Sequence, residues 1–163
     1  MGSTRSFTSS WAKPIVVLDV ETAAHVQVPD SVRPFFAAAI MFTYHVDSAE
    51  TAELIARLLT AGAISLGFFG ESESVRQSHD IADVLREATE INAKHIVTTI
   101  ADEGPLDAAI FAFLGMAMPI DDLYEDVTAY LFVNIGDDLS GKNLLGNLRK
   151  AVPSLIPAQL DLV

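Results

Sequence analysis

The sequence predicts an α/β protein, a three-layer Rossmann-like sandwich with a mainly parallel sheet of about five strands. Short apolar runs alternate along the chain with segments of helical periodicity, as in parallel sheets joined by crossover helices. Segment 95–136 shows this best, because a β-rich run ends directly in an acidic helix start. That start leads into a nearly uncharged helix and then another strand, which is the pattern of a βαβ crossover.

Five β-rich runs are predicted to be strands: 14–20, 35–45, 63–69, 95–100 and 127–135. Run 35–45 has eleven uncharged residues without alternation, which is typical of a strand buried on both faces, although its alanines also favour a helix. We expect 35–45 near the centre of the sheet, between 63–69 and 95–100. Run 127–135 is then expected beyond 95–100, and run 14–20 at an edge.

Helices are expected between these strands. Asp47 or Ser48 can cap a helix that runs to about Ala61, and Gly62 suits its carboxyl end. A second helix is expected at about 74–88 and a short terminal helix at 143–151. The segment 108–118 carries no charge, so we expect a helix that is deeply buried or covered by a second subunit.

The chain divides into three parts by composition. The small, polar residues 1–12 are predicted to be a disordered segment, and residues 13–152 a single α/β domain. Residues 153–163 form an apolar tail that contains two prolines. Such a tail is expected to pack on its own domain or on a second copy, so we expect a homodimer.

Charge and cysteine content exclude several classes of function. The formal net charge is −12, which disfavours binding to nucleic acid and to membrane surfaces and favours basic partners. No cysteine is present, so disulfides, thiolate catalysis and cysteine metal sites are excluded. The first residues lack the pattern of a signal peptide, and we expect a cytoplasmic protein.

The candidate ligand site lies where the strands end. Ligands of open α/β sheets bind beyond the carboxyl ends of the strands, where the strand order reverses. We expect that point between the turn at 44–47 and the turn at 98–103. The candidate ligand-binding residues are His45, Asp47, Thr99, Asp102 and Glu103.

Known catalytic and cofactor motifs are missing from the sequence. No glycine-rich nucleotide fingerprint or phosphate loop occurs, and no serine lies in a nucleophile elbow. The four histidines (His25, His45, His79 and His95) have no zinc-site spacing. Acids at 102, 103, 107, 137 and 138 suit magnesium, but helix capping explains them better. We therefore expect no catalytic residue, metal or cofactor.

The run IVTTIADEGPLDAAIFAF at 96–113 resembles a segment in a family of small, uncharacterised bacterial α/β domains. In that family, a strand ending in two threonines leads into an acidic turn with Pro-Leu and an aromatic-rich helix. The resemblance covers roughly residues 35–136, but Ile100 and Ala101 replace an expected Trp-His pair. The family has no assigned activity, so the resemblance implies a fold and little more.

Two functions fit the sequence. The first is a non-catalytic protein-interaction or regulatory module, favoured by the acidic charge, the missing motifs and the apolar helix and tail. The second is a small-molecule- or metal-binding enzyme with its site at the carboxyl ends of the strands.

Overall fold

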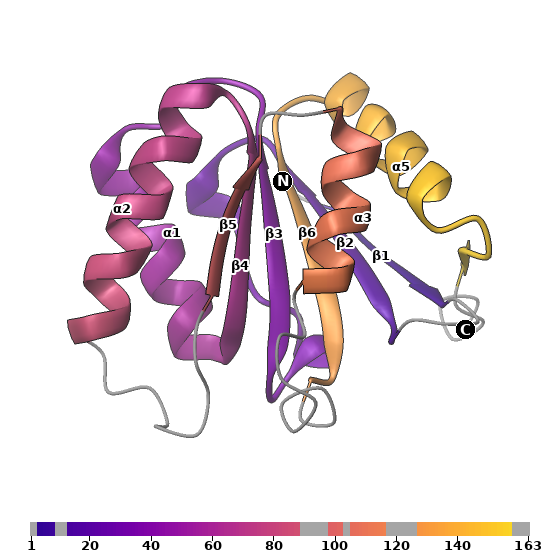
Figure 1. The fold of residues 1–163 in the computed structure, drawn as a ribbon, viewed down its shortest axis with the longest axis horizontal. Helices are drawn as coiled ribbons and strands as arrows, with labels where there is room; N and C mark the ends of the chain where they lie inside the picture. Colours follow the sequence, from indigo (N-terminus) through magenta and orange to yellow (C-terminus); the bar gives the residue numbers. More distant parts are fainter. Residues whose placement is uncertain (1–2, 9–12, 89–97, 103–104, 117–126, 158–163) are drawn as a thin grey trace.

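The computed structural model describes residues 3–8, 13–88, 98–102, 105–116 and 127–157 and confirms an α/β fold. Its strands form one sheet in the order β5-β4-β3-β6-β2-β1-β7 (Figure 1). The strands are β1 (Ser3–Thr8), β2 (Ile15–Val20), β3 (Phe36–Phe42), β4 (Ala63–Gly70), β5 (Thr98–Asp102), β6 (Ala129–Ile135) and β7 (Ile156–Pro157). The α-helices are α1 (Ser48–Ala61), α2 (Ser72–Ala88), α3 (Leu106–Met116) and α5 (Asp138–Ala151).

The sheet is mixed, with seven strands where about five were expected. Strands β5, β4, β3, β6 and β2 pair in parallel with their neighbours. Strand β1 pairs antiparallel with β2 on one side and with β7 on the other. The two additional strands are therefore the ones that run against the parallel part.

The expected strand order is wrong in the placement of β5 and β6. Strand β3 is flanked by β4, as expected, but its second neighbour is β6, and β5 lies beyond β4 at the edge. Strand β2 lies inside the sheet, between β6 and β1. The burial explains this order, because all seven residues of β6 are buried and such a strand belongs in the interior of a sheet.

Helices cover both faces of the sheet. Helices α1 and α2 lie on one face, and α3 and α5 on the other (Figure 1). A hydrophobic core lies on each face, the first under α1 and α2 and the second under α3 and α5. Side chains of β3 alternate between them, with Ala38 and Ile40 in the first core and Ala37 and Ala39 in the second. Within the second core, Phe113 of α3 packs edge-on against Phe69 and Phe132, with ring centroids 6.1 and 5.9 Å apart.

Helix α1 confirms the capping prediction at both ends. Asp47 is the N-cap, and its carboxylate accepts a hydrogen bond from the Glu50 amide. Gly62 follows the helix in the left-handed conformation, with φ of 119°. Its amide donates to the carbonyl groups of Leu58 and Leu59, which satisfies the last turn of the helix.

The predicted disorder of segment 1–12 does not hold for Ser3–Thr8, which forms β1. Two side chains hold this strand, because Phe7 is buried and Arg5 donates to Asp19 over 2.6 Å. In the predicted apolar tail, Ile156–Pro157 pairs with β1, while 158–163 lie outside the described residues.

Among the described helices, none is both long and apolar enough to cross a membrane.

Candidate functional site

The carboxyl ends of the parallel strands meet at one edge of the sheet, which we call the carboxyl edge. Phe42, the last residue of β3, is in register with Gly70 of β4 and with Ile135 of β6. Ile135 is in turn in register with Val20, the last residue of β2. The loops that follow these four strands are therefore neighbours in space, although they are far apart in the sequence.

An open pocket of about 530 Å³ lies at this edge, where the strand order reverses. Its lining comes from the ends of β2, β3 and β6: Glu21, Thr43, Tyr44, Gly136, Asp137 and Asp138. From β3 the chain continues through α1 to β4, whereas from β6 it continues into α5 on the opposite face. The reversal thus falls between β3 and β6, and our expectation that it lies between the turns at 44–47 and 98–103 is wrong.

Backbone and side-chain hydrogen bonds hold the floor of this pocket. The Thr43 hydroxyl donates to the Ile135 carbonyl over 2.8 Å, and the Gly136 amide donates to the Val20 carbonyl over 2.9 Å. A Cβ atom on Gly136 would overlap the Thr43 hydroxyl, so glycine is needed here for close packing. The pocket is therefore a fixed feature of the strand ends.

The walls of the pocket are acidic and partly aromatic. The Tyr44 hydroxyl donates to the Glu21 carbonyl over 2.7 Å, and burial together with nearby Glu50 raises the Tyr44 pKa. Asp137 is the N-cap of α5, and hydrogen bonds from the Ser140 amide and hydroxyl lower its pKa. With Glu21, Asp137 and Asp138 around it, the pocket repels phosphate and attracts cationic groups.

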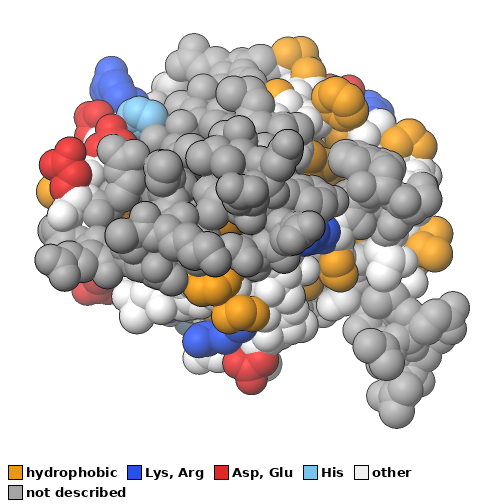
Figure 2. Space-filling view, turned by 60° about the horizontal axis from the view of Figure 1, so that its bottom comes forward, with side chains coloured by type: hydrophobic (Ala, Val, Ile, Leu, Met, Phe, Trp, Pro, Cys, Tyr) orange, Lys and Arg blue, Asp and Glu red, His pale blue; other side chains and the backbone are white. Residues whose placement is uncertain are grey.

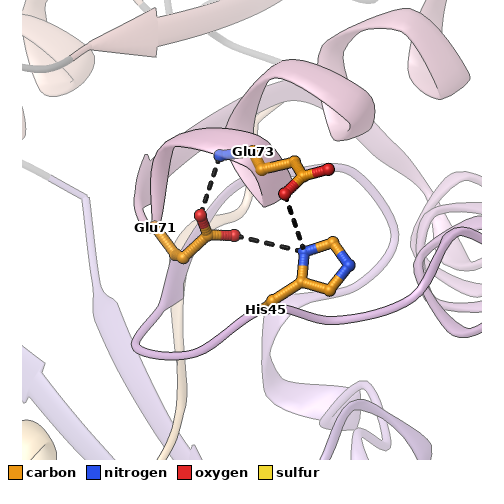
Figure 3. Close-up of side chains that lie close together, drawn as sticks. All are labelled: His45, Glu71 and Glu73. Carbon is orange, nitrogen blue, oxygen red and sulfur yellow. Dashed lines mark hydrogen bonds and ion pairs between the residues drawn. The ribbon is translucent and has the colours of Figure 1, made fainter.

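A second group of polar side chains lies at the carboxyl ends of β3 and β4 (Figure 3). His45 follows β3, and Glu71 and Glu73 lie at the start of α2. His45 Nδ1 is 3.4 Å from Glu71 Oε1 and 3.9 Å from Glu73 Oε2. Among the described residues, these three are the His, Asp and Glu side chains placed closely enough to share a metal ion.

Glu71 is fixed in its orientation by the start of α2. One carboxylate oxygen accepts from the Glu73 amide at 2.9 Å, and the other accepts from the Ser74 amide and hydroxyl at 2.9 and 2.8 Å. These bonds lower the pKa of Glu71 to about 2, with a further contribution from His45. The carboxylate therefore stays ionised at neutral pH.

The loop that carries His45 is tied to the same helix. The amide of Val46 donates to the Ser74 hydroxyl over 3.0 Å, and the Gln77 side chain donates to the Val46 carbonyl over 2.5 Å. Ser74 is fully buried, so this attachment is shielded from water. One serine thus positions both the backbone beside His45 and the carboxylate of Glu71.

The structure separates the five predicted site residues. His45 lies beside Glu71, while Asp47 caps α1. Thr99 is in register with Leu66 and Asp102 with Phe69, which places both in the edge strand β5, separated from β3 by β4. Glu103 lies outside the described residues.

Sequence reasoning missed Glu71 and Glu73 as partners of His45. The prediction that β3 and β4 are neighbours already implies that the loops after them meet. The acids of the run Gly-Glu-Ser-Glu at 70–73 could therefore have been placed beside His45. For Asp137, the sequence favoured helix capping over magnesium binding, and its carboxylate does accept from the Ser140 amide at the start of α5.

Comparison with protein-family models, with curated proteins and with solved structures gave no match to this chain. The resemblance to a family of uncharacterised bacterial domains therefore stays a prediction.

Proposed function

We propose that this chain is a non-catalytic interaction or regulatory module that binds a basic protein partner at the carboxyl edge of its sheet. One observation carries the proposal, namely the charge of the loops at that edge. Segments 21–22, 43–47, 71–74 and 136–138 contain six Asp and Glu residues and neither Lys nor Arg. A field of one sign over adjacent loops steers oppositely charged partners and weakens with salt.

The same charge argues against nucleic acid and membrane surfaces as partners. With a net charge of −12, the chain repels phosphate groups. The absence of cysteine from the sequence supports a reducing, cytoplasmic location as part of this proposal. The parallel pairing of β5, β4, β3, β6 and β2, with helices on both faces, supports a Rossmann-like three-layer class.

A labelled hexalysine peptide tests the charge argument directly by fluorescence anisotropy. We expect saturable binding that weakens as sodium chloride rises from about 50 to about 200 mM. The triple variant Glu21→Gln, Glu73→Gln, Asp138→Asn removes three exposed charges from the carboxyl edge and leaves the caps Asp47, Glu71 and Asp137 in place. It should bind more weakly than the wild-type protein at every salt concentration.

A matched control separates this surface from the overall charge. The triple variant Glu53→Gln, Asp80→Asn, Glu87→Gln removes the same number of exposed charges from α1 and α2, away from their first turns. Equal loss of binding in both triple variants would mean that net charge alone attracts the peptide, and the proposed surface would be abandoned.

A small-molecule-binding enzyme is a second candidate, favoured by the 530 Å³ pocket at the reversal of strand order. Its acidic walls and the Tyr44 ring favour a ligand with an amine or other cationic group. Native mass spectrometry of gently purified protein distinguishes the candidates. A retained small molecule whose mass is lost in the Gly136→Val variant would favour this second function.

A further inference from the structure

We propose that His45, Glu71 and Glu73 form a binding site for a divalent transition-metal ion of the zinc type. The protein supplies one imidazole nitrogen and two carboxylate oxygens, and solvent supplies the remaining ligand. This inference concerns a different group of side chains from the pocket between β3 and β6. It does not depend on the proposed partner binding.

The spacing of the three side chains is already close to that of a tetrahedral site. Zinc bonds to imidazole nitrogen and carboxylate oxygen are about 2.0 to 2.2 Å long, so neighbouring ligand atoms are about 3.3 to 3.5 Å apart. His45 Nδ1 lies 3.4 Å from Glu71 Oε1 and 3.9 Å from Glu73 Oε2. All three ligand atoms lie within 4.8 Å of one another. A small movement of the exposed Glu73 side chain completes the geometry.

Two of the three ligands are held in place before any ion arrives. The Glu73 amide and the Ser74 amide and hydroxyl donate to Glu71, and the His45 loop is bound to Ser74 and Gln77. Outer hydrogen bonds of this kind orient metal ligands and raise affinity.

The donor set selects the type of ion. Magnesium and calcium prefer oxygen ligands, whereas imidazole suits zinc, copper, nickel and iron. The side chains of His45 and Glu73 are 50% and 62% exposed, so water can reach the remaining coordination position. His45 would coordinate through Nδ1, which faces the two carboxylates in Figure 3, and its Nε2 would carry the proton.

A simpler interpretation is an ion pair between protonated His45 and the two glutamates. Exposed ion pairs of this type contribute little to stability and give no affinity for metal. The positive end of the α2 dipole also opposes a cation, although a helix dipole has only a small effect on a charge at the surface. The two interpretations therefore differ in a measurable property, which is saturable metal binding that requires His45.

The experiment is a titration of the full, untagged chain with zinc chloride, in which isothermal calorimetry measures the affinity and the number of ions bound. Cobalt titration, followed by visible absorption, reports the coordination geometry. Three variants are compared with the wild-type protein: His45→Ala, Glu73→Gln and the control His79→Ala. The control removes a histidine that also lies beside a carboxylate, since His79 Nε2 is 3.7 Å from Asp83 Oδ2. Glu71 is left unchanged because its carboxylate accepts hydrogen bonds from the first turn of α2.

We expect one ion per chain and a cobalt spectrum of tetrahedral intensity. His45→Ala and Glu73→Gln should each weaken binding by at least about tenfold, in line with the cost of perturbing metal sites. His79→Ala should bind like the wild-type protein. Circular dichroism checks that each variant is folded, and His45→Gln replaces His45→Ala if the latter is not. Absence of saturable binding, or equal affinity in wild-type and His45 variants, would overturn the proposal.

Discussion

Arg5 and Asp19 join β1 to β2 through a 2.6 Å hydrogen bond between the guanidinium group and Asp19 Oδ2. The two side chains are 40% and 22% exposed, so the pair is only partly screened by water. Strand β1 in turn carries β7 on its other side. The pair therefore adds a side-chain contact to the β1–β2 backbone pairing, which joins the antiparallel part of the sheet to the parallel part.

Replacing this arginine should loosen β1 without unfolding the domain. We expect Arg5→Met to lower the free energy of unfolding by about 0.5 to 1 kcal/mol, the usual range for a well-formed but accessible ion pair. Urea denaturation measures the change, and hydrogen exchange should show faster exchange at Thr4 and Ser6. Arg33→Met is the control, because Arg33 pairs at 3.6 Å with the fully exposed Asp30. Equal losses in the two variants would contradict the assigned role of Arg5.

Gly62 is the residue that α1 needs to end where it does. Its φ of 119° disfavours any residue with a Cβ atom, and that atom would overlap the Pro34 carbonyl oxygen. We expect Gly62→Ala to cost more than about 2 kcal/mol of unfolding free energy, because left-handed strain and steric overlap add. Gly146→Ala is the matched control, since nothing lies within 4 Å of the added methyl group. Because Gly146 is exposed in the middle of α5, Gly146→Ala should raise the free energy of unfolding by about 0.5 to 1 kcal/mol.

Acid should weaken the contribution of Glu71 to stability. Its pKa is lowered from 4.5 to about 2 mainly by the amides of Glu73 and Ser74, so the unfolded chain takes up the proton first as the pH falls. The contribution is complete above about pH 4.5 and is lost as the pH approaches 2. The difference in unfolding free energy between wild-type and Glu71→Gln proteins should therefore narrow over this range.

Urea denaturation at several pH values measures this difference. Ser74→Ala removes one hydroxyl donor to Glu71, so it should remove only part of the pH-dependent difference. Parallel curves for the wild-type and Glu71→Gln proteins between pH 5 and 2 would show that the hydrogen bonds to Glu71 do not favour its ionised form.

A homodimer remains our prediction, and the exposed apolar residues of α3 and α5 provide its test. Phe111 is 61% exposed and Leu139 is 75% exposed. Figure 2 shows exposed hydrophobic side chains at several separate places on one face, so single residues must be tested. We expect a dimer by light scattering at about 20 µM and a monomer for Phe111→Glu. Val84→Glu is the control on α2, and a monomeric wild-type protein would refute the prediction.

The sequence predicted the parts of the fold that depend on local chemistry. Asp47 and Gly62 set the ends of α1 because side-chain capping and a left-handed glycine act within a few residues. The neighbouring positions of β3 and β4 follow from the short α1 crossover between them. His45 was selected because it ends the run 35–45 that was predicted to be a strand, whereas β3 itself ends at Phe42.

The failures all concern contacts between distant segments. The order of β5 and β6 depends on which strand fits beside β3, and neither composition nor periodicity encodes that choice. Ser3–Thr8 was predicted to be disordered because it is rich in serine and threonine, and its one buried apolar residue, Phe7, gives too weak a strand signal. Glu71 and Glu73 were not grouped with His45, although the loops after the neighbouring strands β3 and β4 bring them together.

The central position of β6 has a consequence for the order in which the chain can fold during synthesis. In the part of the chain that the structure describes, the parallel neighbour of β2 is β6, with Ile15 in register with Tyr130. Strands β3, β4 and β5 can pair with one another as they leave the ribosome. Strand β2 can pair with β6 only after β6 has also been synthesised. Until then, the apolar residues of β2 have β1 as their one partner strand within the described residues. Because β2 and β6 are far apart in the sequence, their late pairing predicts slow folding. It also predicts a period during synthesis in which chaperones can bind the apolar residues of β2.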